Sequence, residues 1–280
     1  MAIVTTDNQH FMDIAAAIRA KNGTDTQYTP AEMPAAIQAI SGGGEPEPPD
    51  DGKTRLYINV PENAMEGLPP PRADVPLYIA QTVSNGVSID WGDGSEPETI
   101  SGTGNVKTTH HYASGGDYVI TLAPSDGCEL NFGWNDSENC IMGYCFDTGL
   151  VYCGMLRKVI TGKNVPKIAE TAFYRCGSLS TVIMSGDTKI IGMGAYGEDD
   201  SIASILIGET VNEIESSAFV YCYGIKEFHI RSKIPPVIQD DTFFGVPADA
   251  VYYVPKGSLS EYRTATNWSL RAERIQEEPT

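Results

Sequence analysis

A pattern with a period of 23 residues, running from Cys145 to about Val254, constrains this chain more than any other feature of its sequence. Further apolar residues recur at fixed places within each copy, and most copies also carry a cysteine at one fixed place. The copies begin at Cys145, Ile168, Ile191, Ile214 and Val237, and three of them carry the pairs Ala172-Phe173, Ala195-Tyr196 and Ala218-Phe219. A fixed period of roughly 20 to 50 residues means that each copy is one coil, which can bury its apolar face only against its neighbours. The sequence therefore predicts a solenoid of about five coils.

Each coil contains one short run of residues that favours a β-strand. The clearest runs are 181–184, 204–207 and 227–230, which are rich in β-branched or aromatic residues. The stretch that carries the alanine–aromatic pair has apolar residues at helical spacing, but it is too short for more than about one turn. We predict that the three runs lie side by side as strands of one parallel sheet, each followed by a bend and a compact return.

Two copies depart from the pattern. Asp199 stands in the column that otherwise holds cysteine, which predicts a bulge in the third coil. The pair Thr242-Phe243 falls one residue late, which predicts an insertion in the last coil.

The columns resemble the BspA-like leucine-rich repeats, and the resemblance covers residues 145–275. The chain also ends in the way that such arrays often do, with Tyr252 to Leu259 followed by Tyr262 and Trp268. The resemblance implies repeats over 145–257, a C-terminal cap over 258–280, and a surface for binding other molecules.

The charge of the chain limits its partners. The 280 residues include 19 Lys and Arg against 37 Asp and Glu, a formal net charge of −18. Nucleic acids and anionic membranes need a basic face, so we expect neither as a partner. No run of 18 apolar residues is present, and the first residues lack the features of a secretory signal, so we expect no membrane insertion and synthesis in the bacterial cytoplasm without export.

Residues 1–41 are predicted to form a small helical hairpin. The apolar residues of its two short helices fall on one face each: Phe11, Ile14 and Ile18, then Met33, Ile37 and Ile40. Two such helices are marginal alone, so this stripe is expected to be an attachment interface, packed either on another protein or on its own chain. The segment resembles an N-terminal module of phage and prophage tail and baseplate proteins. Residues 42–53, rich in Gly, Pro and acidic residues, are predicted to be a linker.

Residues 54–126 are predicted to form an all-β domain. The stretch Ile89-Asp90-Trp91-Gly92-Asp93-Gly94 and the later pair of β-rich segments around His110 and Tyr118 resemble the PKD family of immunoglobulin-like sandwiches. The resemblance implies a spacer or binding module, with Trp91 as its buried centre. Residues 127–144 are then a connection and N-terminal cap for the repeats. The fold class is thus mainly β and multidomain.

The sequence contains little that indicates chemistry. The four histidines form no H-E-x-x-H motif, and neither a G-x-S-x-G nor a phosphate-binding loop occurs. Asp90 and Asp93 could share a calcium ion, but a turn in which they bind their own backbone is favoured. The acidic stretch 198–200 is interpreted as a solvated turn. We therefore expect no enzyme, no cofactor and no metal site.

The six cysteines include no C-x-x-C motif. Cys153 and Cys176 are one coil apart, within reach of a disulfide on distance alone. Without an export signal, free buried thiols are favoured.

Tyrosine and arginine gather at one place in the coils. They lie between the alanine–aromatic pair and the cysteine column, where a bend should bring them to one edge of the solenoid: Tyr152, Tyr174, Arg175, Tyr221 and Tyr223. Such side chains give rigid contact area with polar tips. We interpret them as ligand-binding residues, with the alternative that they only cover the edge of the stack.

Three classes of function are compatible with a repeat protein of this kind. The resemblances favour a host-recognition protein of a phage or prophage tail, such as a tail fibre or baseplate protein, that resides in the virion. It would bind other virion proteins through residues 1–41, and a host surface protein or glycan through the solenoid. The alternative is a BspA-like adhesin on the bacterial cell surface. An enzyme such as a glycan hydrolase would need two carboxylates across a cleft, which the repeats do not show. Formation of homo-oligomers is left open.

Overall fold

The computed structural model describes residues 51–62, 73–134, 139–144, 152–184 and 187–279. The chain divides into two compact units, Met1–Asp51 and Gly52–Thr280. The predicted hairpin, its attachment residues and nearly all of the predicted linker lie outside the described residues. No helix among the described residues is long and apolar enough to cross a membrane.

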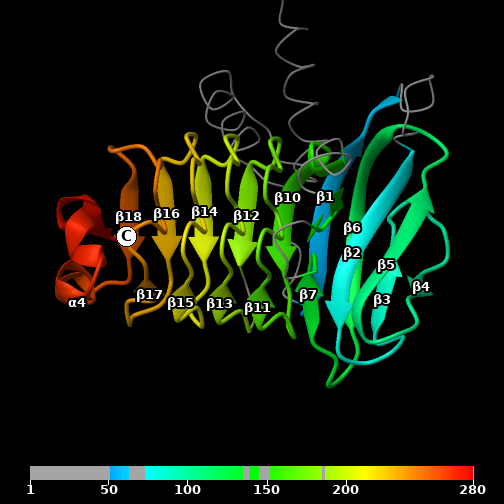
Figure 1. Ribbon diagram of the computed structural model, residues 1–280, viewed down its shortest axis with the longest axis horizontal. Coiled ribbons are helices and arrows are strands. Elements are labelled where there is room, and N and C mark those ends of the chain that lie inside the picture. The colour runs from blue at the N-terminus through cyan, green and yellow to red at the C-terminus, as the bar shows by residue number, and fades with distance from the viewer. Residues whose placement is uncertain (1–50, 63–72, 135–138, 145–151, 185–186, 280) are drawn as a thin grey trace, which may run out of the picture. The chain divides into compact units, whose positions relative to one another are not determined.

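The Gly52–Thr280 unit is built on one ten-stranded sheet, whose order is β19-β18-β16-β14-β12-β10-β1-β6-β3-β4. Its repeat strands are parallel and stand side by side in Figure 1: β10 (Leu156–Thr161), β12 (Thr181–Met184), β14 (Ser204–Ile207), β16 (Glu227–Ile230) and β18 (Val251–Val254). The strands predicted at 181–184, 204–207 and 227–230 are therefore confirmed, and so is their order as neighbours.

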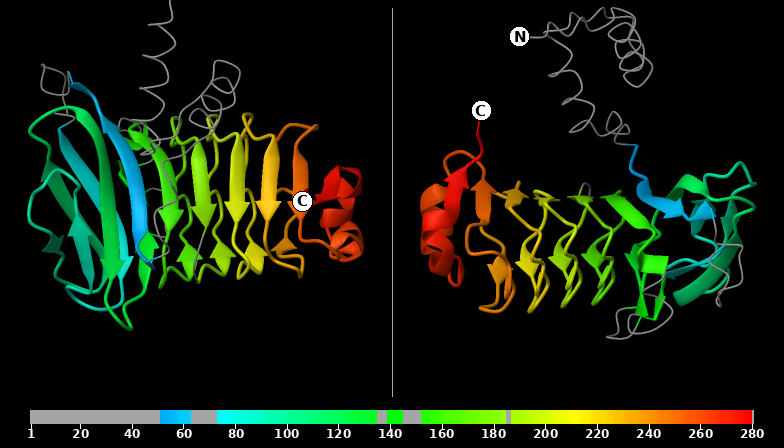
Figure 2. Two further views of the ribbon diagram at one scale, coloured as in Figure 1. Left: turned by 180° about the vertical axis from the view of Figure 1, so that it is seen from behind. Right: turned by 90° about the horizontal axis from the view of Figure 1, so that it is seen from above.

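The second strand of each coil is short and forms a sheet of its own. This parallel sheet has the order β11-β13-β15-β17, with β11 (Lys167–Ile168), β13 (Ile190–Ile191), β15 (Glu213–Ile214) and β17 (Val237–Ile238). Figure 2 shows the two rows of strands from behind and from above. A return without regular secondary structure then leads each coil back to the long sheet.

The last coil is shifted by one residue. Ile214 pairs with Ile238, not with Val237, and Phe228 pairs with Tyr252, not with Val251. The extra residue lies in the loop 231–236 between β16 and β17, which confirms the predicted insertion and corrects the starting residue of the last copy. Val237 is accordingly 60% exposed, whereas Ile238 is buried.

A ladder of aromatic rings runs through the interior of the coils. Phe173, Tyr196, Phe219 and Phe243 stack in sequence, with ring centroids 5.2, 5.5 and 5.6 Å apart. All four side chains are buried, because the apolar side of each coil packs against the next coil. The alanine before each ring in the first three of these coils is also buried. This ladder is the structural basis of the alanine–aromatic column.

Asp199 does not cause the predicted bulge. The strand pairing on both sides of it keeps its register, and the side chain lies fully buried in the cysteine column. Its carboxylate oxygens are fully buried, and the donor that faces them is the backbone of Cys176. Burial raises the pKa of this carboxyl well above its usual value, because the interior disfavours its charged form.

The sandwich consists of two antiparallel layers at one end of the solenoid (Figure 1). One layer is the continuation of the long sheet: β1 (Thr54–Val60), β6 (Gly116–Pro124), β3 (Val87–Asp90) and β4 (Glu98–Thr99). The other layer has the order β5-β2-β7, with β5 (Gly104–His111), β2 (Asp74–Gln81) and β7 (Leu130–Phe132). As predicted, Trp91 is buried, and its backbone carbonyl accepts a hydrogen bond of 2.9 Å from the Tyr112 hydroxyl.

The segment between sandwich and solenoid contacts both. It contains the two-stranded sheet of β8 (Asn139–Cys140) and β9 (Gly143–Tyr144). Tyr78 N donates to Ile141 O, and Ile141 N donates to Ala172 O, each at 2.8 Å. Phe132 of the sandwich strand β7 also packs on Phe173 at a centroid distance of 5.4 Å, so the sandwich and this segment together cover the interior of the first coils.

A C-terminal cap covers the last coil. It consists of α4 (Leu259–Thr264), the 3-10 helix η2 (Trp268–Arg274) and β19 (Ile275–Glu277), which pairs in parallel with β18. Tyr262 and Trp268 are buried and donate hydrogen bonds to the carbonyls of Ser232 and Pro236.

Candidate functional site

The returns of successive coils share one tight turn. Arg175, Glu198 and Tyr221 occupy the same place in consecutive coils, with φ angles of 59°, 59° and 57°. The last coil has Gly245 there, with φ 83°. Because left-handed backbone costs a non-glycine residue of order 1–3 kcal/mol, glycine would be the less strained choice in every coil. Three coils nevertheless carry a large side chain at this place.

Backbone hydrogen bonds between coils fix the position of this turn. Arg175 N donates to Gly197 O at 2.9 Å, Glu198 N donates to Val220 O at 2.8 Å, and Tyr221 N donates to Phe244 O at 2.8 Å. Strands of neighbouring coils lie about 4.8 Å apart, so side chains at this turn stand in a regular row along one edge of the solenoid. We call the row formed by Tyr174, Arg175, Glu198, Tyr221, Tyr223 and Phe244 the return edge.

At one end of the return edge, three side chains form a charge-coupled group. Arg175 Nε donates to Glu198 Oε2 at 2.8 Å, and the Tyr174 hydroxyl donates to Glu198 Oε1. The Arg175 guanidinium also lies over the Tyr174 ring, 5.2 Å from its centroid. Burial and then the bond to Glu198 raise the pKa of Tyr174 to about 12. Burial alone would raise the pKa of Glu198, but the bonds from Arg175 and Tyr174 lower it.

At the other end, three aromatic side chains form an exposed cluster. The ring of Tyr221 lies 5.9 Å from that of Tyr223 and 5.5 Å from that of Phe244. Their exposed fractions are 39%, 60% and 57%. Phe244 was missed in the sequence, because the insertion before β17 moves it into line with Tyr174 only in the structure. An exposed cluster of large aromatic residues is a common mark of a binding surface.

Tyr152, which the sequence placed in the same row, does not belong to the return edge. Its side chain is only 6% exposed. It precedes β10 in the first described coil, where the segment 139–144 covers the end of the solenoid. The other four predicted residues, Tyr174, Arg175, Tyr221 and Tyr223, do lie on the edge; whether they bind a ligand stays a prediction.

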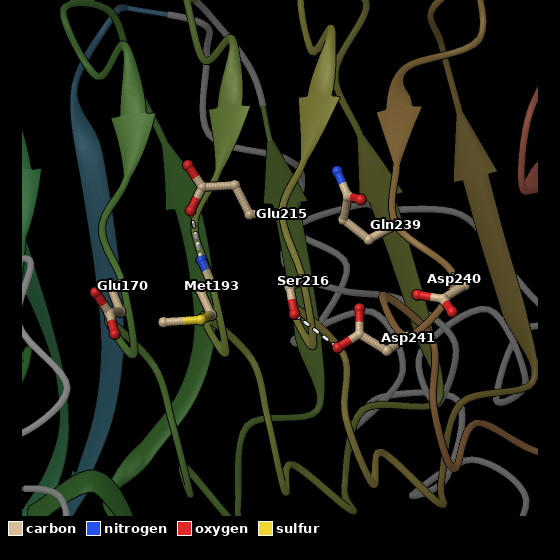
Figure 3. Close-up of a pocket in the computed structure, with 7 residues that line it drawn as sticks. All are labelled: Glu170, Met193, Glu215, Ser216, Gln239, Asp240 and Asp241. Atoms are coloured by element: carbon tan, nitrogen blue, oxygen red, sulfur yellow. Dashed lines mark hydrogen bonds between the residues drawn. The ribbon is translucent and has the colours of Figure 1, made fainter.

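A second surface feature is an acidic groove near the start of the returns, which sequence reasoning missed. Its lining residues stand in a row across neighbouring coils (Figure 3), and the open groove has a volume of about 460 Å³. Glu215 accepts hydrogen bonds from Met193 N at 2.9 Å and from Lys167 Nζ at 3.0 Å. Asp241 accepts hydrogen bonds from the Ser216 and Ser217 hydroxyls, and the bond from Ser216 is the main reason for its lowered pKa. The groove is therefore anionic and can accept hydrogen bonds.

The two aspartates of the sandwich hairpin bind their own backbone. Asp90 Oδ1 accepts a bond from Gly92 N at 2.9 Å, and Asp93 Oδ1 accepts one from Ser95 N at 3.0 Å. Burial would raise the pKa of Asp93, but bonds from Ser95 and His110 outweigh it and lower the pKa to about 2. The turn predicted in place of a calcium site is thus observed. Among the residues that the structure describes, no group of three or more His, Cys, Asp and Glu is placed to hold a metal ion.

Stacked parallel coils that share one row of side chains define a solenoid repeat protein. Residues 131–247 match the family described as "BspA type Leucine rich repeat region", in six copies. The chain therefore contains BspA-type repeats, as the sequence columns indicated, and the match begins ahead of Cys145.

The chain is similar to the crystal structure of the pneumococcal vaccine antigen PcpA, with 15% identity and a TM-score of 0.27, over 44% of this chain and 42% of that one. It thus spans less than half the length of that structure. No curated protein matches the chain.

Proposed function

We propose that this chain is a non-enzymatic, adhesin-like binding protein of the bacterial cell surface, which recognises a surface protein or glycan through the return edge of its solenoid. The observation that carries the proposal is the exposed cluster of Tyr221, Tyr223 and Phe244 on a turn fixed by backbone hydrogen bonds. Aromatic side chains held in place lose little conformational entropy on binding, so they contribute strongly to affinity. BspA-like repeats are most often found in cell-surface adhesins, which supports this location.

The group of Tyr174, Arg175 and Glu198 at the other end of the return edge adds specificity. Arg175 is held by Glu198 and by the Tyr174 ring, so the positive charge of its guanidinium has a fixed place on the edge. Together with the aromatic cluster, this end of the edge suits a ligand with both apolar faces and hydrogen-bonding groups, as sugars and peptides have. The sandwich, with the PKD-like motifs of residues 89–94, is proposed to serve as a spacer.

The test measures binding of the labelled full-length protein to animal epithelial cells. The cells are used untreated, after protease treatment, and after periodate oxidation of their glycans. The proposal expects saturable binding that one of the two treatments removes, and loss of binding in the variant Tyr221→Ala/Tyr223→Ala/Phe244→Ala. The matched control is Leu270→Ala, which removes a 69% exposed apolar residue of the C-terminal cap. Equal binding by the triple variant and the control would contradict the proposal.

A virion protein of a phage or prophage tail is the second candidate. Its support is the likeness of residues 1–41 to an N-terminal module of tail proteins, with the apolar stripe of Phe11, Ile14, Ile18, Met33, Ile37 and Ile40 as the attachment surface. Protease digestion of intact bacterial cells and analysis of purified particles separate the two locations. Release of the protein from cells supports the adhesin. Its presence in particles, and its loss from them when residues 1–41 are deleted, supports the tail protein.

A further inference from the structure

The strongest unexplained feature is a pair of buried thiols at the seam between sandwich and solenoid. Cys140 Sγ and Cys153 Sγ are 2.9 Å apart, and both side chains are fully buried. A disulfide bond is about 2.05 Å long, so the two sulfurs need to move by less than about one ångström to bond. The sequence suggested Cys176 as the neighbour of Cys153; the structure brings Cys140 to it instead.

The pair joins segments that belong to different parts of the fold. Cys140 ends the short strand β8, next to Ile141, whose backbone bonds to Tyr78 of the sandwich and Ala172 of the solenoid. Cys153 lies one turn before β10 and two residues before Met155, whose carbonyl accepts a bond from Asn59 of the sandwich. A covalent bond between the two cysteines would therefore fasten the covering segment to the first coil where sandwich and solenoid meet.

We propose that Cys140 and Cys153 form a disulfide bond when the protein folds in an oxidising compartment. The oxidant is a small-molecule disulfide. One cysteine thiolate attacks it and releases one small thiol, and the second thiolate then attacks the mixed disulfide and releases the other small thiol. The small disulfide gains the two electrons and the two protons that the cysteines lose. Because the pair is fully buried, this exchange takes place before the covering segment closes, or when that segment opens.

The bond would stabilise the folded protein. Closing the loop between residues 140 and 153 restricts the unfolded chain, which raises the free energy of unfolding. Disulfides persist at cell surfaces and are rare in the cytosol, so the inference agrees with the proposed location without resting on it.

The experiment refolds the full chain in a mixture of oxidised and reduced glutathione, and separately in excess reductant. Each sample is digested without reduction and its peptides are weighed. The proposal expects, in the oxidised sample only, a linked peptide pair that contains Cys140 and Cys153 and lacks two hydrogen atoms. Thermal unfolding of the oxidised protein should occur several degrees higher, and added dithiothreitol should remove the difference.

Variants test the pairing independently. Cys140→Ser and Cys153→Ser should each abolish the linked peptide and the thermal shift, whereas Cys176→Ser should keep both. The peptide map of the unaltered protein needs no variant, so a variant that fails to fold does not leave the proposal untested. Free thiols at both positions after oxidative refolding, or a link from Cys153 to Cys145 or Cys176, would overturn it.

Discussion

Leu56 of the sandwich strand β1 pairs with Val159 of the first repeat strand β10, in an antiparallel register. The same β1 pairs with β6 on its other side, so one sheet runs from the sandwich through all the coils. The sandwich and the solenoid are therefore joined by backbone hydrogen bonds as well as by the chain. Repeats of a solenoid need a cap on each open end, and here the sandwich takes that place at the first coil.

This shared sheet predicts that sandwich and solenoid unfold together. Native-state hydrogen exchange should give the slowest amides of β6 and those of β14 the same opening free energy, because neither part can open without breaking the β1–β10 pairing. Exchange of all β6 amides through an opening of lower free energy, while β14 stays protected, would show two independent domains.

The aromatic ladder predicts which substitutions destabilise the solenoid most. Phe219→Ala should lower the free energy of unfolding by about 3–5 kcal/mol, because it leaves a cavity between Tyr196 and Phe243. Phe243→Ala should cost a similar amount, since Tyr252 and Trp268 cover that ring on the cap side. Denaturant titration measures both. Phe244→Ala is the matched control: it is 57% exposed and should change stability by less than about 0.5 kcal/mol. A cost below about 1 kcal/mol for Phe219→Ala would contradict the ladder.

The buried carboxyl of Asp199 predicts that replacing it raises the free energy of unfolding, by an amount that depends on pH. In the unfolded chain this carboxyl ionises with a pKa near 3.9, whereas burial raises its pKa well above that value in the folded protein. Folding therefore takes up a proton above about pH 4, and stability falls as the pH rises from there toward the raised folded pKa. Asp199→Cys restores the column of Cys176 and Cys222 and removes this loss.

The free energy of unfolding of Asp199→Cys, measured in reductant, should exceed that of the unaltered protein by about 1–3 kcal/mol at neutral pH. This difference should shrink on acidification to about pH 4. A gain that is constant across this range would show that the Asp199 carboxyl is not the cause.

The contact between Glu198 and Tyr174 predicts how the pKa of Tyr174 changes when Glu198 is replaced. In Glu198→Gln the pKa of Tyr174 should fall from about 12, because the negative charge that opposes phenolate formation is gone, and burial alone should keep it above 10. Ultraviolet titration of each protein against its own Tyr174→Phe counterpart isolates this tyrosine. Glu215→Gln, which removes a carboxylate elsewhere on the coils, should leave the value unchanged. An unchanged pKa in Glu198→Gln would mean that Glu198 does not contact Tyr174.

The period of the sequence predicted the repeat strands because each coil repeats the same burial at the same step of 23. What it missed arises from contacts outside that period. The shift of Phe243 predicted the insertion but not its place. It lies in the loop 231–236, so Ile238 and Tyr252 stand in the columns where Val237 and Val251 were expected. Tyr152 is buried, and its neighbour Cys153 contacts Cys140 of the segment 139–144, a contact that the repeat pattern does not contain.

Asp199 and the thiol pair show the same limit in the chemistry of the interior. A carboxyl in a cysteine column suggests distortion, yet the strands beside Asp199 keep their register, and burial raises the pKa of the carboxyl instead. Cys153 has Cys176 as its neighbour in the repeat, but the end of the solenoid also places Cys140 Sγ 2.9 Å from its sulfur.

The claim that the return edge is the recognition surface is tested most directly by the concentration of protein that half-saturates epithelial cells. Tyr223→Ala should raise this concentration about tenfold or more, a loss of roughly 1.4 kcal/mol that is typical of an aromatic hot spot, while its thermal unfolding stays unchanged. Leu270→Ala should leave the concentration as it is. Unaltered binding by Tyr223→Ala, or an equal loss in Leu270→Ala, would contradict the account.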